Sequence, residues 1–208
     1  MLDWDTLGGL HVDVALLQRA TAQDHASVEG TVSLMDPELD LSEYVAVICR
    51  MHGVVAAWEE CAEAAAPEWL KPHLQDRSRL KLLEQDIVNL KGGIGGDRAP
   101  LPAFRGEAEL MGAMYVMEGS RLGGQLIARH VENRLGLGSG HGVAYLLGHG
   151  RSTGAKWKEF LGVLESRVPE SATPEVIYGA KLMFRAFEDW MRGMRPDTLL
   201  CVVTAQTE

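Results

Sequence analysis

Three glycines interrupt a helical pattern in the stretch MYVMEGSRLGGQLIARH, which spans residues 114–130. Each glycine inside a helix costs about 1 kcal/mol relative to alanine. At helical spacing Gly119 and Gly123 share one face, and Ser120 and Gly124 form the row beside it. This strip without large side chains favours the close approach of backbone to a broad, flat molecule such as a planar cofactor. Close packing between helices through small residues is the alternative.

One histidine near the N-terminus is the best candidate to bind iron in such a cofactor. His25 lies on the apolar stripe of an expected helix. Glu29 follows one turn later, where its carboxylate can orient the imidazole through the second ring nitrogen. Taken alone, His25 also suits a satisfied core or boundary histidine. His141 and His149 each lie in a GHG triplet, but no further ligand spacing supports a metal site there.

Helical periodicity dominates the chain, and alternating strand patterns are scarce. We therefore expect one all-α domain of seven or eight helices over residues 1–195, followed by a β-prone tail over 196–208 that we do not place. The segment GGIGGDRAPLP, residues 92–102, breaks the pattern and is expected to be a loop. Asp76 and Thr173 are the expected caps of two helices. The expected helices span about 12–32, 42–65, 68–75, 76–91, 103–135, 143–147, 153–167 and 173–194.

The composition indicates an ordinary globular protein. The 208 residues are 46% apolar and 24% charged, which suits one domain with a full core. A net charge of -9 disfavours nucleic acid as a partner. The N-terminus lacks a signal-peptide pattern, no apolar run is long enough for a bilayer, and the three cysteines form no CxxC pair. We expect a cytoplasmic protein that binds neither nucleic acid nor membrane.

Two segments together resemble the heme oxygenases. They are ALLQRATAQDHASVEG, residues 15–30, and GAMYVMEGSRLGGQLIARHVENRLGL, residues 112–137. The chain is most similar to the bacterial branch, which includes the enzymes that supply biliverdin to bacterial phytochromes. RSTGAKWKEFLGVLE and GAKLMFRAFEDWM lie where that branch has similar segments, so the resemblance extends to about Met194.

The resemblance implies an all-helical domain in which heme is sandwiched between a proximal and a distal helix. His25 matches the proximal iron ligand, and Glu29 matches a glutamate that hydrogen-bonds this ligand. Gly119, Gly123 and Gly124 match glycines of the distal helix, which would lie over the heme face and let the helix bend.

Proton delivery is the point where the chain departs from the animal enzymes, which carry an aspartate at the position of Ser120. We expect a water chain anchored on backbone groups, Ser120 and Arg121. Met117, beside the glycine strip, is a further candidate contact for heme. Arg19, Lys181 and Arg185 are candidates to bind the heme propionates, although solvated surface charges are the alternative for all three.

The reaction that the resemblance implies is oxidative ring opening of heme to biliverdin, carbon monoxide and ferrous iron, with dioxygen and external electrons. The donor would be a ferredoxin or a flavoprotein reductase, and a bacteriophytochrome could accept the biliverdin. A non-catalytic heme carrier or sensor on the same scaffold is the alternative. Other helical-scaffold chemistry, such as thiamin-related hydrolysis or di-iron oxidation, lacks supporting motifs. Five basic residues are expected to form a docking patch for the donor: Arg121, Arg129, Arg134, Lys156 and Lys158.

Overall fold

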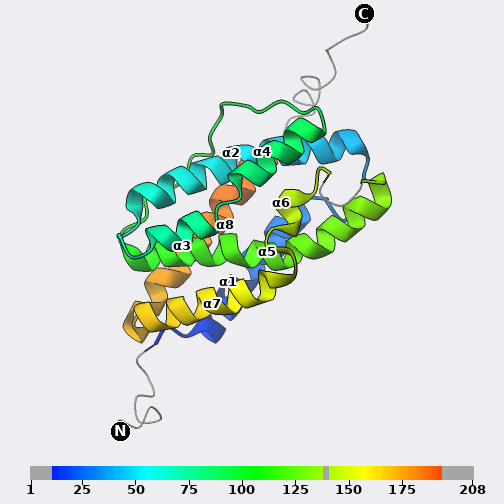
Figure 1. The fold of residues 1–208 in the computed structure, drawn as a ribbon. Helices are drawn as coiled ribbons and strands as arrows, with labels where there is room; N and C mark the ends of the chain where they lie inside the picture. The colour runs from blue at the N-terminus through cyan, green and yellow to red at the C-terminus, as the bar shows by residue number, and fades with distance from the viewer. Residues whose placement is uncertain (1–10, 138–140, 194–208) are drawn as a thin grey trace, which may run out of the picture.

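The structure, a computed structural model, describes residues 11–137 and 141–193, and all regular structure within them is helical (Figure 1). The all-α prediction is therefore confirmed, whereas the tail over 196–208 lies outside the described residues. None of the described helices is both long and apolar enough to cross a bilayer. The helices are α1 (Val14–Thr31), α2 (Leu41–Ala65), α3 (Lys71–Asp76), α4 (Leu80–Asn89), α5 (Glu107–Leu135), α6 (Ala144–Leu147), α7 (Thr153–Arg167) and α8 (Thr173–Arg192), with short 3-10 turns η2 (Gly150–Ser152) and η3 (Glu170–Ala172).

The core is organised around the crossing of α5 and α8. Gly112 of α5 lies against the backbone carbonyl of Val176, and Gly179 of α8 lies against the backbone carbonyl of Glu109. A Cβ at either glycine would overlap the partner's backbone, so small residues are what let the two helices touch. α8 packs against α1 as well as α5, while α1 and α5 make little contact with each other.

The start of α4 differs from the expectation because the group that caps it is not local. Asp76 is the last residue of α3 rather than the cap of the next helix. Instead Glu59, on α2, accepts hydrogen bonds from the backbone N–H groups of Arg79 and Leu80 at 2.8 and 3.0 Å. These are donors that the first turn of α4 leaves unpaired.

The starts of α5 and α8 also differ from the prediction, α5 in its first residue and α8 in the role of Thr173. α5 begins at Glu107, later than expected, because Gly106 has a φ of +86° that no helix can contain. Thr173 is the first residue of α8 and not its cap. Its hydroxyl accepts a hydrogen bond from the backbone N–H of Asp13 at 3.2 Å and so joins the starts of α8 and α1. The expected loop over 92–102 contains no helix, as predicted.

Candidate active site

The imidazole of His25 projects from α1 and is largely exposed. Its side chain keeps 58% of its surface accessible, and its Nδ1 lies 3.6 Å from a carboxylate oxygen of Glu29, one turn along the helix. The ring edge meets Phe184 of α8, with centroids 6.0 Å apart. Nε2 makes no hydrogen bond to any described residue. This exposure does not fit a satisfied core histidine and leaves one ring nitrogen available to a ligand.

Two of the α5 glycines lie on an exposed surface. A Cβ at Gly123 would meet nothing within 4 Å, and a Cβ at Gly119 would make only ordinary contact with the Trp157 ring at 3.7 Å. The neighbouring Leu122 and Leu126 are 44% and 59% exposed, which is high for leucine. We call Gly119, Leu122, Gly123 and Leu126 the open face of α5. No packing contact within the described residues requires glycine there.

Gly124 has a different role from its neighbour Gly123. A Cβ at Gly124 would lie 2.7 Å from the backbone carbonyl oxygen of Leu146, in α6. The close-packing alternative therefore applies to Gly124, and the strip of glycines divides between a packed position and two open ones.

The open face and His25 belong to two helices that share α8 as their support. α5 meets α8 at Gly112, about two turns before Gly119, and His25 meets α8 at Phe184. α1 and α5 themselves make little direct contact with each other. In the view of Figure 1, α1 passes behind α5.

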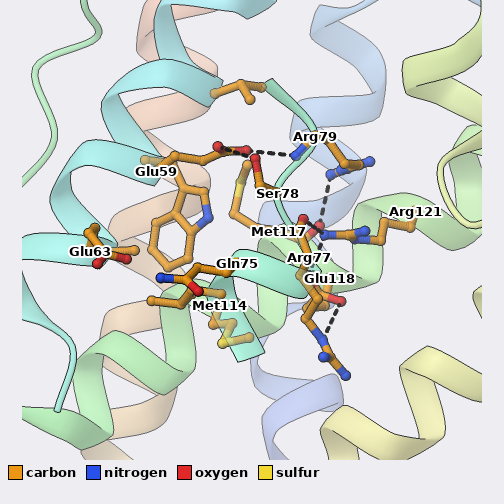
Figure 2. A pocket seen from close by; sticks show the side chains of 14 residues that line it. Glu59, Glu63, Gln75, Arg77, Ser78, Arg79, Met114, Met117, Glu118 and Arg121 are labelled. Carbon is orange, nitrogen blue, oxygen red and sulfur yellow. Dashed lines mark hydrogen bonds and ion pairs between the residues drawn. The ribbon is translucent and has the colours of Figure 1, made fainter. Parts of the chain in front are cut away.

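Met117 and Arg121 lie on the other side of α5. Each is two residues from Gly119, which places it about 200° around the helix. Both side chains line a separate cavity of about 320 Å³ between α2, α3, the start of α4, and α5. Figure 2 shows Met117 and Arg121 at this cavity together with Arg77 and Arg79. The structure thus does not bring Met117 or Arg121 to the open face.

Arg121 belongs to a buried ionic cluster. Its Nη2 lies 2.8 Å from one carboxylate oxygen of Glu118, and the other oxygen lies 3.3 Å from Nε of Arg77. Arg121 also donates to the backbone carbonyl of Arg77. Burial raises the pKa of the Glu118 carboxyl, an effect that the arginines oppose. Burial and the nearby Arg79 lower the pKa of Arg121 to about 10. The cluster fastens α5 to the end of α3.

Ser120 lies at the edge between these two sides. Its hydroxyl donates to the carbonyl of Met117 at 2.8 Å and accepts from Nη2 of Arg79 at 3.1 Å. The Arg79 guanidinium also stacks over the Tyr145 ring, 4.5 Å from its centroid. Sequence reasoning missed Arg79 because it lies on a different segment, 41 residues earlier, with no local pattern that links it to Ser120.

The candidate propionate residues differ in how available their charges are. Lys181 pairs with Asp24 of α1 at 3.0 Å. Arg19 and Arg185 are exposed and form no ion pair with a described residue. Both can therefore meet an anionic ligand without leaving a partner, whereas Lys181 must first give up Asp24.

The five residues of the predicted docking patch do not all lie at the surface. Arg121 is buried, Lys156 pairs with Asp76 at 2.6 Å, and Arg134 lies 3.6 Å from a carboxylate oxygen of Glu38. Of the five residues, Arg129, Arg134 and Lys158 are exposed. Sequence spacing could not reveal these acidic partners, because they come from distant segments.

The residues at the open face and on α1 fit heme. A single neutral imidazole suffices for iron that a porphyrin already holds, and no group of three or more His, Cys, Asp or Glu suited to a bare metal ion occurs in the described part of the chain. Backbone without side chains at Gly119 and Gly123 leaves room for a flat ring. Exposed leucines offer it apolar contact.

Comparison with known proteins identifies the family of the chain. The family model described as heme oxygenase matches residues 14–193. A heme oxygenase of Xanthomonas campestris pv. campestris (strain 8004) is 34% identical over 154 residues, which are 72% of this chain and 88% of the relative.

Solved structures of bacterial heme oxygenases share the fold. The NO- and CO-bound enzyme from Neisseria meningitidis has a TM-score of 0.74 at 24% identity, over 92% of this chain and 94% of its own. Heme oxygenase from Leptospira interrogans has a TM-score of 0.71 at 17% identity, over 86% of this chain and 98% of its own. Given the family match and the Xanthomonas relative, the chain belongs to the heme oxygenase family.

Proposed function

We propose that the chain opens the heme ring oxidatively to biliverdin, carbon monoxide and ferrous iron, and that heme binds between α1 and the open face of α5. The observation that carries this proposal is the pairing of an exposed imidazole on α1 with an exposed, glycine-lined face on α5. The two helices share α8 as support and make little contact with each other. Membership of the heme oxygenase family supports the same reaction.

His25 would bind the heme iron through Nε2. Glu29, whose carboxylate lies 3.6 Å from Nδ1, is placed to orient the ring and to favour the tautomer with its proton on Nδ1. When bound, heme supplies both the iron centre for dioxygen chemistry and the carbon skeleton that is oxidised.

The open face supplies shape rather than reactive groups. Gly119 and Gly123 keep side chains away from the space above the ring, so that main chain can come close. Leu122 and Leu126 lose exposed apolar surface when a flat ligand covers them, which favours binding and excludes water from the reaction.

Protons reach this face from water at Ser120 in our proposal. Ser120 is exposed, and Arg79 fixes its hydroxyl oxygen from behind. The serine can thus anchor a water chain at the edge of the open face. Arg121, buried behind α5, takes part by fixing the helix and not by contact with water at the heme.

Arg19 and Arg185 would hold the heme propionates, and Lys181 would do so only after it leaves Asp24. A family member of this kind needs heme, dioxygen and a reductase. We propose a ferredoxin or flavoprotein reductase as donor and a bacteriophytochrome as acceptor of biliverdin. The cytoplasm is the proposed compartment, because Cys49 and Cys61 are free thiols, which a reducing compartment preserves.

Hemin titration followed by reduction tests the proposal. The heme complex is incubated with ascorbate, or with ferredoxin and its reductase, in the presence of catalase. We expect the Soret band to disappear while a biliverdin spectrum grows. A persistent oxygen-bound spectrum would identify a carrier or sensor instead, and no binding of hemin would reject a heme function.

A His25→Ala variant tests the ligand. Loss of the axial nitrogen should abolish ring opening and weaken hemin binding, and added imidazole should restore part of the Soret spectrum. The matched control is His141→Ala, which removes an exposed histidine of the segment before α6. Equal hemin spectra for His25→Ala and the unmodified protein would exclude His25 as the ligand.

A further inference from the structure

Residues 146–153, which we call the brace, are fastened to α5 behind its open face. Gly124 touches the carbonyl of Leu146, as described above. Gln125 donates to the carbonyl of Gly150 and to the Thr153 hydroxyl, the latter at 2.8 Å.

The third attachment of the brace is a hydrogen bond between Arg121 and His149. Nη1 of Arg121 lies 2.8 Å from Nε2 of His149. Arg121 and Gln125 are each two residues from an open glycine, and so lie on the opposite side of α5 from Gly119 and Gly123. The brace therefore supports the helix at the same turns that carry the open face.

The chemistry of the Arg121–His149 contact fixes the protonation state of the histidine. A guanidinium has donors but no acceptor, so Nε2 of His149 must offer a lone pair. The imidazole is then neutral and carries its proton on Nδ1. Protonation at Nε2 would replace the hydrogen bond by a contact between two cations.

The surroundings of His149 act against protonation. Burial lowers the pKa of His149, the cations Arg121, Lys156 and Arg77 lower it further, and Asp76 opposes them. These groups come from four places in the fold. They are Arg121 on α5, Lys156 on α7, Asp76 at the end of α3 and Arg77 directly after it.

The backbone around His149 is shaped to make this contact. Gly148 and Gly150 have φ values of +52° and +54°, in the left-handed region that favours glycine. The GHG triplet thus turns the chain sharply on both sides of the histidine. The backbone turn therefore accounts for the two glycines of the triplet, and no metal site is needed to explain them.

We propose that His149 is a positioning residue for α5: as a neutral acceptor for Arg121 it helps to hold the brace against the helix, and protonation breaks this attachment and loosens the brace. The link from the brace to catalysis rests on the proposed function, since the open face is where we place heme.

The direction of the pH effect follows from the lowered pKa. The unfolded chain takes up a proton near the ordinary imidazole pKa of about 6.5, whereas the folded protein takes it up only at lower pH. The stabilisation from neutral His149 is therefore complete above that ordinary value. It is lost as the pH falls through the pKa of the folded state.

The test uses the heme-free protein, so that it does not depend on the proposed function. Nitrogen-15 NMR of the imidazoles should show His149 neutral at pH 7.5, with its proton on Nδ1, and titrating below the ordinary imidazole pKa of about 6.5. A proton on Nε2, or a titration at or above that ordinary value, would overturn the proposal.

Two substitutions at position 149 test separately whether the side chain acts as a hydrogen-bond acceptor and whether its titration matters. Gln in His149→Gln can place its amide oxygen near the position of Nε2 but does not titrate. We expect this variant to match the unmodified Tm at pH 7.5 and to exceed it at pH 5.5. His149→Leu lacks an acceptor and should have a lower Tm than His149→Gln at both pH values. Equal losses for Gln and Leu, or an acid loss in His149→Gln as large as in the unmodified protein, would reject the proposal.

His141→Gln, in the other GHG triplet, is the matched control and should keep the acid loss of the unmodified protein. A second measurement connects the brace to the site: hemin affinity should fall between pH 7.5 and 5.5 more in the unmodified protein than in His149→Gln. If the heme-free measurements agree with the proposal and hemin does not bind at all, then the proposed function fails and the role of His149 in holding the brace stands.

Discussion

Four glycines of α5 divide into two pairs that differ in what lies opposite them. Gly112 and Gly124 each face a backbone carbonyl of another segment, which a Cβ would displace. Gly119 and Gly123 face a side-chain ring at ordinary distance and open space, respectively. In the first pair, packing offsets the weaker helix propensity of glycine. In the second pair no packing contact within the described residues offsets that cost, and this difference points to a ligand.

The largest effect is expected at Gly112. In Gly112→Ala the new methyl group overlaps the carbonyl of Val176, so α5 and α8 must separate. We expect a loss of about 3 kcal/mol or more in the free energy of unfolding, measured by urea denaturation. The control is Gly162→Ala on α7, where a Cβ meets nothing within 4 Å. A Gly112→Ala protein as stable as that control would show that the crossing is looser than described.

An intermediate effect is expected at Gly124. The methyl group of Gly124→Ala would lie 2.7 Å from the carbonyl oxygen of Leu146, and α6 is short enough to shift. We expect a loss of about 1–3 kcal/mol, measured in the same way. Amide exchange should become faster in residues 144–153 but not in α8. Unchanged stability and exchange would place Gly124 with the open pair.

The smallest effect on stability, of opposite sign, is expected at Gly123. Gly123→Ala meets no steric obstacle and removes a poor helix former, so the heme-free protein should gain about 0.5–1 kcal/mol. The same methyl group intrudes on the proposed heme face, and hemin affinity and turnover should each fall several-fold. A variant that is more stable and equally active would remove the argument for a ligand at this glycine.

The sequence predicted the fold well wherever local pattern decides it. The helix over 153–167 was predicted with the bounds that the structure has, from the helical spacing of its own apolar residues. The start of α4 could not be predicted, since its capping carboxylate is on Glu59 of another helix. Gly106 could have corrected the start of α5, because a glycine directly before an acidic helical turn often marks a boundary.

The part of the candidate site that could be predicted is the part in which residues of a single helix turn lie together. His25 and Glu29 are four residues apart, and local spacing brings them together. Arg121 and Met117 could have been set apart from Gly119 by helical geometry alone, because a two-residue separation reverses the direction of the side chain. Gly124 and Gly123 could not be told apart from sequence, because α6 decides which of them is covered.

The cap that Glu59 provides also bears on whether α4 can form by itself. The carboxylate that accepts from the backbone N–H groups of Arg79 and Leu80 lies on α2, outside the segment that it caps. A peptide containing only α4 lacks that acceptor, and its first turn would fray. The independence of α4 is thus limited by a side chain about twenty residues earlier in the chain.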